Sequence, residues 1–237
     1  MTSVQNMRHQ SPAFGIDFGT TNSSMALVMG DSQVQLAEFS LRGVETSSFR
    51  SVLYLEPRKR TGGAQRKHSW SGPAAIEHYL EAEEKGRLIQ SLKSYLSSRT
   101  LTGTEVFGRR YTLEELISRM LSDLREEAER QFGTPIRHAM VGRPVRFVGA
   151  ETDDDDVYAV SRLREAFRLA GFEYVDFEME PVAAAYAYES TLDHDELILI
   201  GDFGGGTSDF SLMRVGPEVR RRGRTPTSPR GPRVNRS

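Results

Sequence analysis

Short apolar segments alternate with longer amphipathic segments along the 237-residue chain, and this alternation predicts a mixed α/β fold. The apolar segments have the length of β-strands, and they cover residues 14–17, 24–29, 34–39, 51–55, 136–141, 174–179, 197–202 and 208–215. Helical spacing of apolar residues is found in 74–83, 87–96, 112–132, 157–170 and 182–189. Residues 57–73 are polar and basic and predict an exposed loop, with Trp70 as its anchor.

Two of the predicted helices have clear starts. Thr112 and Glu115 have the spacing of a capping box, and the leucines that follow form one apolar stripe, which indicates core packing. Residues 153–156 are four consecutive aspartates. Neighbouring residues project in different directions, and acidic residues are favoured at a helix N-terminus, so this run predicts the start of a helix rather than a metal site.

An internal repeat is the most informative pattern in the chain. The segment FGIDFGTTNSSMALV (14–28) aligns with LIGDFGGGTSDFSLM (199–213) at an offset of 185 residues, the separation between Asp17 and Asp202. Gly19 then aligns with Gly204, and Ser23 aligns with Ser208. Each copy reads as an apolar strand, an aspartate, a turn of small residues and a second strand.

This repeated pattern has the chemistry of a phosphate site. Glycines let backbone N–H groups approach phosphate oxygens, and threonine hydroxyls add further donors. An aspartate at a strand end can hold Mg²⁺ through water, since Mg²⁺ keeps several waters and needs few carboxylates. Two such hairpins facing each other would hold a triphosphate from both sides. The G-x-x-x-x-G-K-[ST] motif is absent, so the chain is not a P-loop enzyme.

The amino-acid composition limits the class of protein and its cellular location. Hydrophobic residues make up 38% and charged residues 27% of the sequence, values that predict a globular protein. There is no apolar run long enough to cross a membrane and no secretory signal at the N-terminus. The sequence contains no cysteine, which excludes disulfides, thiolate metal sites and cysteine nucleophiles, and fits a cytoplasmic location.

The charge is unevenly distributed. Residues 217–237 contain seven arginines and one acid, a net charge of +6, whereas the rest of the chain carries −8. Hydrophobic periodicity stops after Gly216, so we predict that residues 217–237 form a disordered basic tail. We also predict that residues 1–12 form a disordered leader. Nucleic acid is an unlikely partner, since the basic tail is the only feature that suggests it.

The sequence resembles the heat shock protein 70 (DnaK-type) chaperones of the actin/hexokinase ATPase superfamily. GIDFGTTNS (15–23) and DFGGGTSD (202–209) resemble their two phosphate motifs, and EPVAAAYAY (180–188) resembles the helix that connects the lobes. VGRPVRFVG (141–149) is typical of the YegD-like branch.

The resemblance implies an α/β fold, an actin-like (ribonuclease H-like) ATPase lobe with a mixed sheet flanked by helices. Residues 13–195 would form this first lobe, 196–216 only the first hairpin of a second lobe, and 217–237 the tail. The family's adenosine-binding segment and substrate domain have no counterpart here, so we expect the chain to be a truncated form with weak nucleotide binding and weak or no ATPase activity.

The resemblance also implies roles for individual residues. Asp17 and Asp202 would lie near Mg²⁺ and its waters, Lys93 would be the catalytic lysine beside the γ-phosphate of ATP, and Glu180 would lie near the attacking water. The residues that would line the nucleotide phosphates of ATP or ADP are Gly19, Thr20, Thr21, Asn22, Gly204, Gly205, Gly206, Thr207 and Asp209. Which of Asp17, Glu180 and Asp202 orients the water stays open at this point.

Other functions remain as alternatives. A sugar or acid kinase and an actin-like cytoskeletal protein of the same superfamily would carry similar hairpins, and the chain could also be an inactive product. Unfolded polypeptide clients and co-chaperones would be partners only of a full-length form, and no membrane partner is expected.

Overall fold

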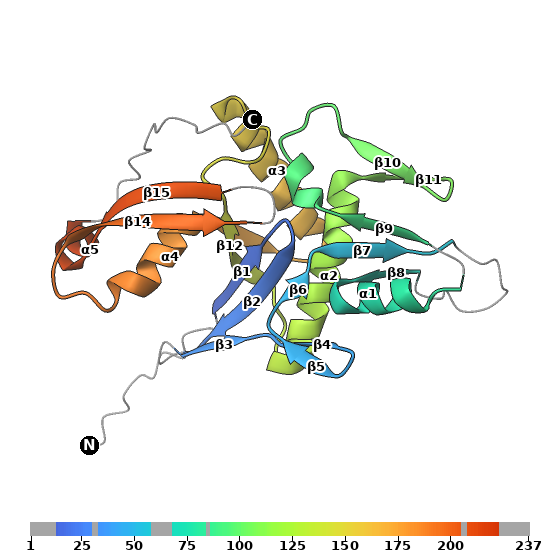
Figure 1. The fold of residues 1–237 in the computed structure, drawn as a ribbon, viewed down its shortest axis with the longest axis horizontal. Coiled ribbons are helices and arrows are strands. Elements are labelled where there is room, and N and C mark those ends of the chain that lie inside the picture. Colours follow the sequence, from blue (N-terminus) through green and yellow to red (C-terminus); the bar gives the residue numbers. More distant parts are fainter. Residues whose placement is uncertain (1–12, 30–32, 58–67, 84–85, 205–207, 223–237) are drawn as a thin grey trace, which may run out of the picture. The chain divides into compact units, whose positions relative to one another are not determined.

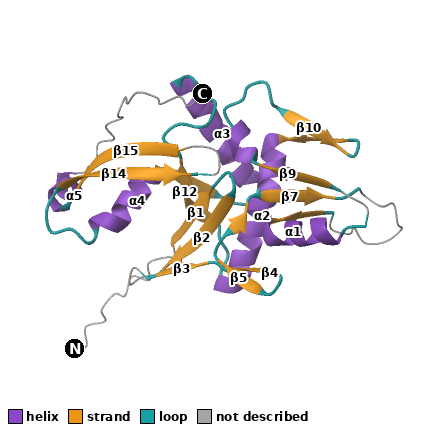
Figure 2. Cartoon of the chain, in the orientation of Figure 1, coloured by secondary structure: helices purple, strands orange, loops and turns teal. Residues whose placement is uncertain are grey.

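The computed structural model describes residues 13–29, 33–57, 68–83, 86–204 and 208–222, and it has the expected mixed α/β fold (Figures 1 and 2). The leader predicted over 1–12 lies outside these residues. The chain divides into two compact units, 1–177 and 178–237, which are considered one at a time below. Helix 180–189 falls in the second unit of this division, whereas the sequence prediction grouped it with the first lobe.

Six strands among the described residues form a mixed sheet in the first unit. The strand order is β13–β12–β1–β2–β3, and β6 also pairs with β2. Strand β1 runs parallel to β12 and antiparallel to β2. The bounds are β1 Ala13–Phe18, β2 Asn22–Val28, β3 Val34–Leu36, β6 Phe49–Arg50, β12 His138–Arg143 and β13 Tyr174–Met179.

Two long helices cover this sheet's apolar side chains. Helix α2 (Leu113–Phe132) packs against β2 and against helix α3 (Asp153–Leu169). The capping box predicted at Thr112 and Glu115 is present in both directions, and the apolar stripe of α2 is buried in the main core. The sequence pattern therefore predicted both the start of α2 and the face that it buries.

A smaller three-stranded sheet, β8–β7–β9, carries helix α1. Its members are β7 Val52–Leu55, β8 Ser69–Ser71, β9 Arg87–Gln90 and α1 Gly72–Glu81. Two hairpins complete the unit: β4 Phe39–Leu41 with β5 Val44–Thr46, and β10 Gly103–Val106 with β11 Arg109–Thr112. The exposed loop predicted over 57–73 is wrong at its end, where residues 69–73 form β8 and the start of α1, while 58–67 lie outside the described residues. Trp70 on β8 stacks on His78, with ring centroids 3.9 Å apart, and packs beside Tyr54.

The helix predicted over 87–96 is wrong. Residues 87–90 form β9, which pairs with β7, and residues 92–95 form a short 3₁₀ helix, η1 (Leu92–Tyr95). Strand β7 pairs with β8 on one edge and with β9 on the other, and this pairing overrides the helical spacing of the segment. Ser91, with φ of 59°, turns the chain sharply between the two elements.

The four consecutive aspartates begin α3, as predicted. Asp155 forms a capping box with Thr152, Asp153 pairs with Arg146, and Asp156 accepts a hydrogen bond from the Phe147 N–H at 2.8 Å. The carboxylates thus point in different directions and serve local structure.

The second unit consists of helix α4 (Glu180–Glu189), the hairpin of β14 (Glu196–Phe203) and β15 (Ser208–Val215), and helix α5 (Pro217–Arg222). Glu189 is buried, accepts a hydrogen bond from the Gly216 N–H at 2.9 Å and pairs with Arg220 at 3.4 Å. These contacts tie α4 to the end of the hairpin and to α5.

The segment predicted to be disordered from residue 217 therefore begins with a helix. The Glu218 N–H donates to the Asp195 carboxylate at 3.0 Å, which satisfies one of the amides at the helix start. The remainder of the predicted tail, 223–237, lies outside the described residues.

The two copies of the internal repeat form hairpins with the same register. Asp17 pairs with Ser24 in the first, and Asp202 pairs with Asp209 in the second, so every pair is displaced by the same offset. The two hairpins differ, however, in the burial of the face that carries Phe18 in the first copy and Phe203 in the second. Phe18 is 1% exposed and belongs to the main core, whereas the aligned Phe203 is 74% exposed.

We predict that equivalent substitutions in the two hairpins have very different effects. Phe18→Ala should lower the free energy of unfolding by about 3–5 kcal/mol because it leaves a cavity in the core. Phe203→Ala should change it by less than about 0.5 kcal/mol because the ring is already in solvent. Urea unfolding followed by circular dichroism and Trp70 fluorescence measures both. Equal losses would contradict the difference in burial.

We also predict an acid-sensitive capping box at α3. The hydrogen bonds from the Thr152 side chain and backbone, and then the one from Arg99, lower the pKa of Asp155 from 3.8 to about 2. A lowered folded-state pKa stabilises the fold above pH 3.8, and this contribution is lost as the pH falls through about 2. The melting temperature of the wild type should exceed that of Asp155→Asn at about pH 5, and the difference should vanish near pH 2. A constant difference would contradict the assignment.

Candidate phosphate-binding hairpins

The first candidate loop follows directly from the alternation of β1. Phe14, Ile16 and Phe18 point into the core, so Asp17 lies on the opposite face, where it is exposed at the end of the strand. Strand β2 begins at Asn22, which leaves a tight turn over Gly19, Thr20 and Thr21. The predicted residues of the first motif are therefore brought together at one end of the sheet.

Gly19 is required by the shape of this turn. A Cβ atom on Gly19 would lie 2.1 Å from the backbone oxygen of Asn22, a distance at which the backbone itself must move. At Gly15, four residues earlier and within β1, such a Cβ would have no atom within 4 Å. The turn thus has a close backbone approach at one specific position, where only glycine fits.

Residues outside the motif hold the turn in place. The Ser51 hydroxyl donates to the Gly19 carbonyl at 2.7 Å and lies 2.9 Å from the Ser23 hydroxyl, and both serines are buried. The Ser51 N–H donates to the Thr21 carbonyl at 2.9 Å. Arg50 Nη1 donates to Asn22 Oδ1, also at 2.9 Å. Sequence reasoning missed Arg50 and Ser51, because they are about 30 residues from the motif and their role depends on the β2–β6 pairing.

The second hairpin places two carboxylates opposite each other. Asp202 and Asp209 are cross-strand partners, and both are exposed. Like charges directly opposite on a sheet repel, and a cation at this position would relieve the repulsion. In the first hairpin the partner of Asp17 is Ser24, so the acidic pair is specific to the second copy. Gly204 follows at the strand end, whereas Gly205, Gly206 and Thr207 lie outside the described residues.

Lys93 and Glu180 are set in defined positions within their own units. Lys93 lies in η1, not in the helix that the sequence predicted, and its side chain is buried with 8% of the residue exposed. Glu180 is the first residue of α4, where a carboxylate is favoured by the helix dipole, and Pro181 follows it. Lys93 therefore belongs with the Asp17 loop in the first unit, and Glu180 belongs with the Asp202 hairpin in the second.

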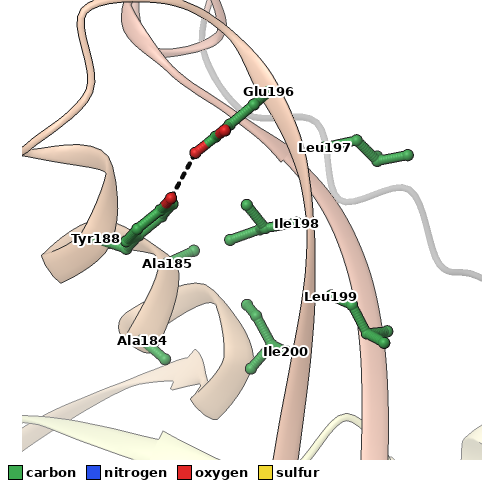
Figure 3. Close-up of a pocket in the computed structure, with 8 residues that line it drawn as sticks. All are labelled: Ala184, Ala185, Tyr188, Glu196, Leu197, Ile198, Leu199 and Ile200. Carbon is green, nitrogen blue, oxygen red and sulfur yellow. Dashed lines mark hydrogen bonds between the residues drawn. The ribbon is translucent and has the colours of Figure 1, made fainter.

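The described residues contain no group of three or more acidic or histidine side chains arranged to bind a metal ion. A groove of about 550 Å³ lies between α4 and β14 in the second unit. Figure 3 shows Ile198 and Ile200 directed toward Ala184 and Ala185, while Leu197 and Leu199 point away from the helix. The predicted phosphate residues do not line this groove, so it is the incompletely filled contact between the helix and the hairpin.

One family model matches the chain. Residues 76–220 match the model described as Hsp70 protein, which is more than half of the sequence. The matched range contains Lys93, Glu180 and the whole second hairpin, and it begins after the first candidate loop. Within the described residues, none of the helices has the length and apolar character needed to cross a membrane.

We predict that Gly19→Ala deforms the first loop, whereas Gly15→Ala does not. The added methyl group at position 19 displaces the Asn22 carbonyl and should cost about 1–3 kcal/mol of stability. The methyl group at position 15 enters open space and should be neutral within about 0.5 kcal/mol. Urea midpoints measure the cost, and exchange rates of the Asn22 and Ser51 amides locate it. Unchanged exchange in Gly19→Ala would refute the close approach.

Proposed function

The chain belongs to the Hsp70 family, whose members bind nucleotide, and we propose that its two hairpins bind the phosphates of ATP or ADP together with Mg²⁺. The observation that carries this proposal is the equivalence of the hairpins. Each has an aspartate at the same register position, two residues before the glycine that follows the strand. Glycine at position 19 allows the tight turn after β1, and the backbone N–H groups of such a turn are suitable donors to phosphate oxygens.

Each predicted residue has a role in this proposal. The backbone amides of the first turn and the hydroxyls of Thr20 and Thr21 would donate to phosphate oxygens, and the loop of Gly204 would do so from the second hairpin. Asp17 and Asp202 would accept hydrogen bonds from waters of Mg²⁺, and the ion would offset the repulsion between Asp202 and Asp209. Bound Mg²⁺ supplies positive charge that stabilises the phosphate oxygens.

Lys93 and Glu180 would act on the terminal phosphate. The Lys93 ammonium would stabilise negative charge on the γ-phosphate oxygens, an effect that is strong in a buried position. Glu180 would orient a water molecule, a role for which Asp17 and Asp202 are the other candidates. We further propose that the protein is a chaperone of the YegD-like branch, based on residues 141–149, and that it acts in the cytoplasm.

We predict that Mg²⁺-ATP binds weakly to the chain and that binding depends on both hairpins. Asp17→Asn and Asp202→Asn should each weaken binding about tenfold or more, which corresponds to about 1.4 kcal/mol. Isothermal titration calorimetry with ATP and ADP, with and without Mg²⁺, measures this directly. The control is Asp153→Asn, an exposed carboxylate at the start of α3. Binding that is equal in all four proteins, or that is absent from the wild type, would refute the proposal.

A further inference from the structure

Arg162 is the most deeply buried arginine in the described residues, with 5% of it exposed. It lies on α3, and its guanidinium enters the core side of the helix, whereas Arg168 on the same helix is exposed and pairs with Glu165. A buried guanidinium is costly unless its N–H groups are satisfied, so its partners indicate what it does.

Those partners are one carboxylate and four backbone carbonyls. The Nε atom of Arg162 donates to Glu114 at the start of α2. The two terminal nitrogens donate to carbonyl oxygens of a single short segment, at distances between 3.0 and 3.5 Å: Tyr95, Leu96, Ser98 and Leu101. The guanidinium thus gathers the carbonyls of the segment that follows η1.

This segment is directly continuous with Lys93. The Leu96 N–H donates to the Lys93 carbonyl at 3.2 Å, while the Leu96 carbonyl accepts from Arg162 at 3.5 Å. On the other side of Lys93, Ser91 has a left-handed conformation that makes the turn depend on its surroundings. A cation at the C-terminal end of η1 also stabilises the exposed carbonyl dipoles there.

The pKa of the Glu114 carboxyl group is lowered by its contact with Arg162. Burial raises the pKa of Glu114, but the hydrogen bond from Arg162, together with the backbone and Thr112 hydrogen bonds and the Arg162 charge, lowers it below its usual range overall. Glu114 therefore stays ionised and holds the guanidinium against the segment from the α2 side.

We propose that Arg162 is a positioning residue for Lys93: it fixes the 95–101 segment from α3 and thereby sets the location of the lysine that acts on the nucleotide. The positioning part rests on contacts within the first unit, and its link to catalysis rests on the proposed function. Sequence motifs give no indication of this role, because Arg162 is 69 positions from Lys93 and reads as an ordinary helix arginine.

Lysine acylation tests the positioning directly. The sequence has only four lysines, Lys59, Lys67, Lys85 and Lys93, so peptide mass spectrometry can follow each after treatment with a limiting acetylating reagent. Buried Lys93 should react slowly in the wild type. In Arg162→Met, the released segment should let Lys93 react about fivefold faster or more, with the other three rates unchanged.

Two further variants keep the test decisive. Arg162→Gln retains an amide donor and should fold even if Arg162→Met does not, and its Lys93 rate should lie between the wild-type and Met values. Arg168→Gln, on the exposed side of α3, is the matched control and should leave all four rates unchanged. A Lys93 rate in Arg162→Gln equal to the wild type, or a uniform rise in all four rates, would overturn the proposal.

The link to nucleotide is read separately. Mg²⁺-ATP should slow Lys93 acetylation in the wild type. If the protein hydrolyses ATP, Arg162→Gln should lower kcat and leave KM unchanged. If ATP does not slow Lys93 acetylation but the Arg162 variants still speed it, the proposed function is refuted and the positioning role stands. If ATP slows the reaction but the Arg162 variants do not change its rate, the positioning role is refuted and the proposed function stands.

Discussion

Burial of one face of the β1–β2 hairpin determines the position of the first candidate phosphate loop. Because side chains alternate along a strand, placing Phe14, Ile16 and Phe18 in the core forces Asp17 to the opposite face. The partner strand contributes Met25 and Leu27 to the same buried face, so a shift of one residue would turn the whole apolar set toward solvent. The turn that joins the strands then has little freedom, and Ser51, whose hydroxyl lies beside that of buried Ser23, donates to its carbonyl groups.

The second hairpin has the same register as the first, but the corresponding face is not buried. Its aligned side chains, Leu199, Phe203, Phe210 and Leu212, are exposed, while α4 packs on the opposite face. What holds this hairpin is the contact with α4 and the buried Glu189 carboxylate at its far end. The end that carries Asp202 and Asp209 therefore has less support from packing, and their mutual repulsion adds to the difference. A ligand that brings positive charge would stabilise the second loop more than the first.

Much of this arrangement could be predicted from the sequence, and the failures have definite causes. The repeat predicted two hairpins of equal register, and the Thr112–Glu115 spacing predicted the start of α2, since both depend on neighbouring residues. The segment 87–96 was predicted incorrectly because pairing with β7 decided its conformation. The start of α5 was missed because its support comes from Asp195, more than 20 residues away. The roles of Ser51 and Arg162 share this origin: each acts on a backbone carbonyl that is distant in sequence and carries no side-chain signature.

Ser51 and Arg162 both satisfy backbone carbonyls, one beside the Gly19 turn and the other beside the buried Lys93. Carbonyl oxygens at a tight turn or at the end of a 3₁₀ helix lack backbone partners, and leaving them unpaired in the interior is costly. Ser51 satisfies the Gly19 carbonyl with a neutral hydroxyl beside the candidate phosphate loop. Arg162 satisfies the carbonyls after η1 with a cation, whose charge is balanced by Glu114. The Arg162–Glu114 ion pair thus joins α3 to α2 beside the segment that follows Lys93. A neutral residue at 162 would leave the Glu114 carboxylate without its ion-pair partner and the carbonyls after η1 without a charged donor.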